Sequence, residues 1–372
     1  MRVLSVQLRD FRTYARAEAA LGPGLTVVHG PNGAGKSNLL EALYFGCTGR
    51  SPRTRNEREL VRFGAQAARV VVRGSDDAQE HELSVAYGAG PDGQRAVKRM
   101  TADGATVERL LDVDFRPLLG VFEPDRLELL KGPPSVRRAH LDQVVAAIWP
   151  LRAGDRREYS RVLAQRNALL ARIRAGRASD ATLATWDREL ALAALAVRAH
   201  RATAVELLAQ PFAERAAQLG LSGDAVLAYR PRSRAADADE FVAELQARLA
   251  TDLERGFTGH GPHRDELAIL RDGRELRSYG SQGEQRLALL ALLLAERAVL
   301  ARERRRTPLM LLDDVMSELD SERRQLLAAE LASDGQSVIA TTDLAHVPGA
   351  SDPRVARLRV SPGAILQEAL AA

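Results

Sequence analysis

The sequence GPNGAGKS at residues 30–37 follows the apolar run LTVVH at 25–29. It matches G-x-x-x-x-G-K-[ST], in which glycines let backbone N–H groups turn toward a phosphate and the lysine reaches the β- and γ-phosphates. The apolar run predicts a strand before the loop, and SNLLEALYFGCTG at 37–49 predicts a helix that ends at Gly49. The N-terminus of such a helix favours anions. The stretch therefore predicts a phosphate-binding strand, loop and helix.

The loop and the first turn of the helix supply the candidate ATP contacts. Lysine is rare in this chain, at 3 of 53 basic residues, so its presence in the loop indicates that a compact point charge is needed there. The hydroxyl of the last loop residue is the expected Mg²⁺ ligand. The predicted contacts are Gly30, Pro31, Asn32, Gly33, Ala34, Gly35, Lys36, Ser37 and Asn38.

A second motif, PLMLLDD at 308–314, has the apolar strand and terminal acids that usually accompany a phosphate loop. We expect Asp313 to hold Mg²⁺ and Asp314 to orient or deprotonate the attacking water, with Lys36 assisting the reaction. The two motifs lie 277 residues apart, at positions 36 and 313. A compact single-sheet NTPase needs far less chain, so the spacing predicts a large insertion.

Composition limits the alternatives. The chain has 372 residues with 45% hydrophobic and 27% charged content, enough for two domains. Its longest apolar run, 287–295, is shorter than the roughly 20 residues of a bilayer span, and the N-terminus lacks the apolar region of a secretory signal. We therefore expect a cytoplasmic protein with no membrane partner, and a buried Cys47 without a disulfide. The net charge of +4 permits DNA as a partner without establishing it.

Several further elements are predicted along the chain. Alternating runs between 69 and 109 predict antiparallel hairpins with turns at 90–93 and 102–105, and 115–134 reads as a loop-rich junction. Apolar residues at helical spacing between 135 and 250 predict helices, including an antiparallel pair at 159–176 and 181–210. Asp272-Gly273 marks a hairpin within 265–279, and the runs at 308–314 and 337–342 suit central parallel strands.

The segment SYGSQGEQRLALL at 278–290 places Ser281 and Gly283 at the start of a long apolar helix, a second helix end suited to phosphate. Residues 281–285 resemble the Ser-Gly-Gly-Gln/Glu signature of ABC-type ATPases, and SELD at 317–320 resembles their D-loop. In that family the signature serves the γ-phosphate of the opposite subunit. The resemblance implies an ATP-dependent dimer in which Ser281, Gly283 and Glu284 contact ATP and Ser281 is catalytic.

Five ordered blocks narrow the resemblance to the RecF family, relatives of SMC proteins: 8–14, 49–60, 123–142, 258–267 and 311–324. The family implies an α/β fold, with an ABC/SMC-type P-loop ATPase head, an antiparallel β subdomain and a short helical arm inserted between Walker A and the signature. We expect head halves at 1–125 and 255–372 and the arm at 126–254. Two departures, His140 for an aromatic and Pro133 for a small residue, bear on packing.

The same resemblance implies an ATP-dependent clamp that binds duplex DNA and single-strand/double-strand junctions. It would act in repair, recombination, replication and the SOS response, helping RecR and RecO load RecA at gaps. Asp314 replaces the usual glutamate, no clear Q-loop glutamine is present, and Thr341, Thr342 and Asp343 replace a switch histidine. These departures predict slow hydrolysis, and with the family resemblance we expect a weak ATPase that DNA stimulates. The alternatives are an ATP-binding scaffold without turnover and a transporter-type ATPase subunit, which lacks such an arm.

Other polar groups leave more than one interpretation open. Arg12 either contacts ATP phosphate or ends a surface strand, and the basic run at 301–306 is either a DNA patch or a solvated helix end. His260 and His263 have a spacing that metal ligands use, although paired histidines in a Gly- and Pro-containing loop are usually structural. The candidate DNA contacts are Arg50, Arg53, Arg55 and Arg58, just after the phosphate-loop helix.

Overall fold

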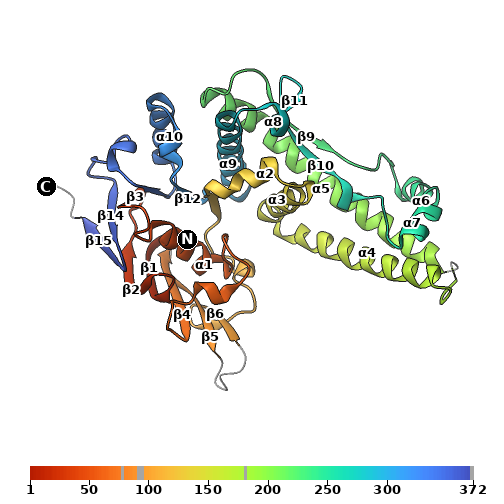
Figure 1. The fold of residues 1–372 in the computed structure, drawn as a ribbon, viewed down its shortest axis with the longest axis horizontal. Coiled ribbons are helices and arrows are strands. Elements are labelled where there is room, and N and C mark those ends of the chain that lie inside the picture. The colour runs from red at the N-terminus through yellow and green to blue at the C-terminus, as the bar shows by residue number, and fades with distance from the viewer. Residues whose placement is uncertain (77–78, 90–95, 180–181, 369–372) are drawn as a thin grey trace. The chain divides into compact units, whose positions relative to one another are not determined.

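The computed structural model describes residues 1–76, 79–89, 96–179 and 182–368 (Figure 1). The chain divides into two compact units. Unit 1 comprises Met1–Pro124 and Arg305–Ala372, and unit 2 comprises Asp125–Arg304. Unit 1 is therefore formed by two separate segments of the chain, and unit 2 is one continuous segment inserted between them.

The phosphate loop of unit 1 leaves a mainly parallel sheet with the order β15-β14-β3-β13-β12-β8. Its inner strands β3, β12 and β13 are short apolar runs in parallel register, as the sequence predicts. The edge strand β8 lies in the segment expected to be a loop-rich junction. The bounds are β3 Leu25–His29, β8 Leu119–Phe122, β12 Leu309–Asp313, β13 Ser337–Thr341, β14 Ala356–Ser361 and β15 Ala364–Glu368.

A second sheet of unit 1 is antiparallel, with the order β2-β1-β4-β5-β6-β7. The predicted turn at 102–105 is present, with Asp103 and Gly104 at positive φ, whereas the turn predicted at 90–93 lies outside the described residues. The strands are β1 Arg2–Phe11, β2 Tyr14–Ala20, β4 Ala67–Ser75, β5 Glu80–Ala89, β6 Ala96–Ala102 and β7 Ala105–Thr106.

Helix α1 (Lys36–Thr48) contacts strands of both sheets, so the core of unit 1 forms around it. Cys47 on this helix is fully buried, as expected, and burial raises the pKa of its thiol to about 12. A buried amide joins the sheets elsewhere: Gln336 accepts a hydrogen bond from the backbone N–H of Val3 and donates to the carbonyls of Val3 and Gly22. Helix α10 (Ser321–Ser333) follows β12.

Unit 2 is mostly helical but also contains a three-stranded antiparallel sheet, β11-β10-β9. Strand β9 lies in a segment expected to be helical, and Asp272 and Gly273 form the predicted turn between β10 and β11. The elements are α2 Glu128–Lys131, α3 Pro134–Ile148, α4 Ala153–Arg174, α5 Leu183–Gln218, β9 Ala225–Arg230, α6 Ala238–Gln246, α7 Leu249–Arg255, β10 Glu266–Arg271, β11 Arg274–Glu275, α8 Leu276–Tyr279 and α9 Gln282–Arg304.

The predicted pair of helices is α4 and α5, which run side by side in Figure 1. Arg161 and Arg166 on α4 pair with Glu189 and Asp187 on α5, and this reversed order shows that the helices are antiparallel. Helix α5 has 36 residues and spans about 54 Å at 1.5 Å per residue.

The compact units differ from the expected segments at one boundary. The break near residue 125 agrees with the sequence, but residues 255–304 group with unit 2 rather than with the C-terminal head segment. Two packing interactions explain this grouping: β10 pairs with β9, and α9 packs along α5. The functional division into two head halves and an arm stays a prediction.

A buried ionic cluster fastens the helices of unit 2. Arg166 on α4 is fully buried, and its guanidinium donates to Asp187 on α5 at 2.7 Å and to Asp252 on α7 at 2.9 Å. The same group donates to the Thr258 hydroxyl at 2.7 Å. Removing one member would leave buried charges uncompensated, which is far more destabilising than losing a surface ion pair.

We predict that Arg166→Met lowers the free energy of unfolding of unit 2 by about 3–5 kcal/mol, because two buried carboxylates lose their counterion. The matched control is Arg161→Met on the same helix, where the ion pairs are exposed to solvent and contribute little to stability. Urea unfolding followed by tryptophan fluorescence measures both, since Trp149 and Trp186 are the only tryptophans and both belong to unit 2. Equal losses in the two variants would contradict the prediction.

Candidate nucleotide-binding site

Two glycines of the phosphate loop have geometry that other residues cannot adopt. Gly30 has φ 149°, and a Cβ there would lie 2.2 Å from the carbonyl oxygen of Val360 on β14. Gly35 has φ 118°, and a Cβ would lie 2.7 Å from the Tyr14 hydroxyl, which donates to the Gly35 carbonyl. The loop is thus closed in by β14 and by the β1–β2 hairpin. Its backbone curls between β3 and α1 as the motif predicts.

Lys36 lies over this loop. Its ammonium donates hydrogen bonds to the carbonyls of Gly30 at 2.8 Å and Pro31 at 3.0 Å. Burial lowers the pKa of Lys36, and the charges of Asp313 and Asp314 act against that shift. The structure therefore brings the lysine and the two predicted acids into one electrostatic environment.

Asp313 and Ser37 join the two motifs that the sequence separates. The Ser37 hydroxyl lies beside the Asp313 carboxylate. Burial raises the pKa of Asp313, whereas Ser37, Arg53 and Lys36 favour its ionised form. A hydroxyl and a carboxylate at the N-terminus of α1 are oxygen ligands of the kind Mg²⁺ takes in nucleotide sites, where phosphates and water complete its coordination. The pair fits the predicted magnesium role.

Asp314 has the most unusual environment in the site. Its φ is 50°, in the left-handed region, and its N–H donates to the Ala340 carbonyl on β13 at 3.0 Å. The buried Oδ1 atom has no hydrogen-bond partner within the described part of the chain. Backbone strain together with an unsatisfied buried carboxylate oxygen is typical of a functional site. The arrangement suits a group that orients or deprotonates water.

Arg12 is held by an acid that the sequence analysis missed. Its guanidinium forms a two-pronged ion pair with Glu41 on α1, at 2.8 and 2.7 Å. Glu41 is fully buried and also accepts from Ser51 at 2.6 Å. A single acid in the apolar run LLEALYF was the available signal. The structure shows Arg12 as a link between the β1–β2 hairpin and α1, and its predicted contact with ATP phosphate stays a prediction.

The candidate DNA arginines differ in their environments. Arg53 donates to Asn38 at 3.1 Å and lies 3.5 Å from Glu41, so it is tied to the first turns of α1. The segment that follows α1 exposes Arg50, Arg55 and Arg58 to solvent. In the basic run at 301–306, Arg304 at the end of α9 donates to the Ala147 carbonyl near the end of α3, and both interpretations of the run stay predictions.

The predicted signature residues begin α9 in unit 2. The N–H of Ser281 donates to the Glu284 carboxylate at 2.7 Å, and the N–H of Glu284 donates to the Ser281 hydroxyl at 3.3 Å. This reciprocal pair is a capping box, and the hydrogen bond from Ser281 lowers the pKa of Glu284. Gly283 follows the cap, and a Cβ there would meet open space. The signature residues and the phosphate loop therefore belong to different compact units.

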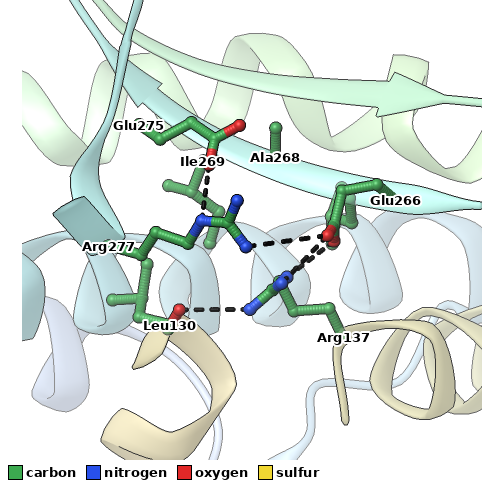
Figure 2. A pocket seen from close by; sticks show the side chains of 8 residues that line it. Leu130, Arg137, Glu266, Ala268, Ile269, Glu275 and Arg277 are labelled. Atoms are coloured by element: carbon green, nitrogen blue, oxygen red, sulfur yellow. Dashed lines mark hydrogen bonds and ion pairs between the residues drawn. The ribbon is translucent and has the colours of Figure 1, made fainter. Parts of the chain in front are cut away.

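The block at 123–142 has a structural role in unit 2, shown in Figure 2. Arg137 on α3 forms a two-pronged ion pair with Glu266 on β10 and donates to the Leu130 carbonyl at the end of α2. The cavity beside it measures about 10 Å³, roughly enough for one water. His140, which departs from the family pattern, pairs with the buried Glu296 of α9 at 2.6 Å.

The two loop histidines, His260 and His263, form hydrogen bonds with other groups of unit 2. His260 Nε2 lies 2.6 Å from the Glu244 carboxylate. His263 accepts from the Tyr159 hydroxyl at Nδ1 and donates from Nε2 to the Thr258 carbonyl. Burial lowers the pKa of His263 to about 4. Nowhere in the described residues do three or more His, Cys, Asp and Glu side chains gather as a metal-binding group, so neither histidine has the neighbours of a metal site.

A phosphate loop on a mainly parallel sheet, an acidic strand end beside it and a capped signature helix define an ATP-binding protein of the ABC/SMC type. The profile of the RecF/RecN/SMC N-terminal domain matches residues 2–352. The DNA replication and repair protein RecF of Heliobacterium modesticaldum is 37% identical over 93% of both chains, and that of an Anaeromyxobacter species is 39% identical over 98% and 99%. The chain belongs to the RecF family.

Solved structures agree with this assignment. The recombination mediator protein RecF-ATP of the RecFOR pathway superposes with a TM-score of 0.86 at 26% identity, covering 99% of this chain and 98% of that one. An SMC head bound to the C-terminal winged-helix domain of ScpA has a TM-score of 0.60 at 17% identity, covering 100% and 98%, and shows the fold alone. The predicted α/β head with an inserted helical arm is thereby confirmed. No helix among the residues described is long and apolar enough to cross a bilayer.

We predict that Asp314→Asn reduces the ATP hydrolysis rate by at least about 100-fold while ATP binding persists, because the amide cannot act as a base. The melting temperature should stay equal or rise, since asparagine tolerates positive φ and carries no buried charge. Phosphate release and thermal melting measure the two effects. Asp313→Asn is the comparison variant and should weaken Mg²⁺-dependent ATP binding. A wild-type hydrolysis rate in Asp314→Asn would rule out the assigned role.

We predict that unit 2 loses stability as the pH falls from about 6.5 toward 4, in part through His263. The unfolded chain takes up a proton at the ordinary histidine pKa, whereas the folded ring resists it down to about 4, so acid favours unfolding by at most about 3 kcal/mol. His263→Gln lacks this titration and should lose less stability across that window. Urea unfolding at pH 7 and 4.5 tests the difference, and parallel losses in both proteins would contradict it.

Proposed function

We propose that this protein is an ATP-gated DNA clamp of recombinational repair. Two copies close on bound ATP and hold duplex DNA or a single-strand/double-strand junction, and slow hydrolysis releases it. The observation that carries the proposal is the unsatisfied, strained carboxylate of Asp314 beside the Ser37–Asp313 pair and Lys36. Curated relatives with the name DNA replication and repair protein RecF supply the DNA context.

The residues of unit 1 divide the chemistry among themselves. The backbone of the glycine loop and Lys36 bind and orient the triphosphate, and Ser37 with Asp313 hold Mg²⁺. When bound, Mg²⁺ neutralises charge on the phosphates. Asp314 Oδ1 is free to accept a hydrogen bond from the attacking water and to take its proton. With an aspartate in place of the usual glutamate, we propose slow turnover, and a steady-state kcat of about 10 s⁻¹ would contradict it.

We propose that the second half of each ATP site comes from the other copy. The capping box at Ser281 presents a helix N-terminus, whose dipole favours the γ-phosphate, and it belongs to the unit that lacks the phosphate loop. In this arrangement Ser281, Gly283 and Glu284 of one copy cover ATP bound to its partner. ATP then holds the dimer together until it is hydrolysed.

We propose that the closed dimer acts in the cytoplasm at gapped DNA, where it assists RecR and RecO in loading RecA. A solved relative bears the name recombination mediator protein of the RecFOR pathway, which supports this context. The exposed arginines of the segment after α1 are the proposed phosphate contacts, so DNA affinity should fall steeply with salt. DNA stimulates the ATPase in this scheme by favouring the closed dimer.

The Asp314→Asn variant distinguishes the clamp from the scaffold alternative, in which ATP is bound but never hydrolysed. A cycling clamp carrying this change should remain on DNA after ATP is chased, because release requires hydrolysis. A scaffold should dissociate at the wild-type rate. Loss of DNA-bound fluorescence after dilution into excess competitor DNA measures the two rates.

We predict that Lys36→Met and Ser281→Arg each stay monomeric with ATP, whereas an equal mixture forms dimers. In the mixed dimer, one composite site has Lys36 from one copy and Ser281 from the other, so one of two sites is intact. Sedimentation velocity with and without ATP measures the association. Ser222→Arg, at an exposed position of unit 2, is the matched control and should dimerise like wild type. A mixture that stays monomeric while wild type dimerises would exclude completion between copies.

A further inference from the structure

Phe63 is the most exposed large apolar side chain of the described residues, at 99% of its full accessible area. A single exposed apolar residue is common on proteins and needs no special explanation by itself. The setting of Phe63 is what makes it informative, because the backbone around it is fixed and the side chains near it in sequence are cationic.

The turn that carries Phe63 is held on both sides. The Ala65 N–H donates to the Arg62 carbonyl at 2.9 Å, and Gly64 has φ 82°, so residues 62–65 form a closed turn with Phe63 at its tip. Arg62 is fastened to Asp10 twice, through its backbone N–H and through its guanidinium, both at 2.8 Å. The ring therefore projects from a rigid base, and its exposure costs little additional ordering when a ligand binds.

The same segment is strongly basic. Residues 49–66 contain five arginines and two glutamates, a formal charge of +3. Acids outside the segment partner Arg53 and Arg62, namely Glu41 and Asp10, and Glu57 pairs with Lys98. The exposed arginines Arg50, Arg55 and Arg58 have no ion pair among the described residues. The cations that flank the turn are Arg50, Arg53, Arg55, Arg58 and Arg62.

This segment is also tied to the nucleotide site of unit 1. Arg53 donates to Asn38 in the first turn of α1, and Ser51 donates to Glu41 near the middle of the same helix. The Arg12 side chain, which pairs with Glu41, donates to the carbonyl of Glu59. The basic segment and its aromatic tip are therefore built onto the helix that begins at the phosphate loop.

We propose that Phe63 is a base-stacking contact for an unpaired nucleotide, with the neighbouring arginines holding the phosphate backbone. This inference rests on the proposed DNA-binding function and deepens it: the segment at 49–66 would distinguish a single-strand/double-strand junction from plain duplex. A flat ring beside cations is the combination that single-stranded nucleic acid binds, because every base offers a π-face and every linkage a negative charge.

Charge and size favour a base over a protein partner. The four residues that follow Phe63 are small or polar, Gly64, Ala65, Gln66 and Ala67, so this stretch adds no second large apolar side chain. A protein contact of ordinary strength needs a cluster of buried anchors surrounded by a rim that excludes water. A nucleotide needs one aromatic face and a few cations, and those are the groups present.

The test compares wild type with Phe63→Ala, Phe63→Trp and Leu366→Ala, in fluorescence anisotropy with ATP. Leu366 is another exposed apolar residue of unit 1, 58% exposed on β15, and serves as the matched control. The probes are a blunt duplex, the same duplex with a single-stranded overhang, and an overhang of abasic nucleotides that keeps the phosphates but lacks bases.

We expect Phe63→Ala to weaken binding to the overhang DNA by roughly 5- to 100-fold and to the blunt duplex by less than twofold. Phe63→Trp should bind the overhang at least as well as wild type, and Leu366→Ala should resemble wild type on all probes. Removing the bases should cost wild type the same factor, and it should cost Phe63→Ala nothing more. This non-additivity is specific to a ring that contacts a base.

Three outcomes would overturn the inference. Equal losses on blunt and overhang DNA would make Phe63 a general duplex contact, and unchanged binding would remove it from DNA recognition. A loss that tracks weaker ATP-dependent sedimentation of the dimer would assign the ring to the interface between copies. If wild type itself shows no ATP-dependent affinity for any probe, the proposed function fails together with the inference, whereas wild-type binding without a Phe63 effect defeats the inference alone.

Discussion

The contact between Ser37 and Asp313 is the interaction on which the nucleotide site depends. It joins the first turn of α1 to the end of β12, although nearly three quarters of the chain separate the two residues. Parallel pairing of β3 with β13 and of β13 with β12 brings these chain segments together. The inserted residues can form a second compact unit because all strands of this sheet come from unit 1.

The elements around the site that the sequence located correctly are those with local causes. A phosphate loop needs glycines at set positions, and buried parallel strands need short apolar runs, so β3, α1, β12 and β13 could be located from pattern alone. Asp314 was assigned a role by its place after a strand. Its strain and its unpaired oxygen depend on how β12 and β13 pack, which no local pattern contains.

The errors have a common physical origin in tertiary packing. Strand β8 and strand β9 are short runs whose strand conformation is fixed by neighbours distant in sequence, β12 and β10. The compact units differ from the expected boundary at 254/255 because α9 packs along α5, whereas the functional division into head halves and arm stays a prediction. Glu41 escaped notice because a buried acid is recognisable only when its partners, Arg12 and Ser51, are seen around it.

The packing of α9 along α5 has a mechanical consequence. Helix α5 continues without a break for 36 residues, through Pro211. Near the loop that joins α4 to α5, Arg166 of α4 forms buried ion pairs with both α5 and α7. A displacement of that end of the α4–α5 pair would therefore be passed along α5 to α9, the helix that Ser281 caps. A protein that binds unit 2 at the loop end of α4 and α5 could thus shift the position of Ser281 without contacting the nucleotide.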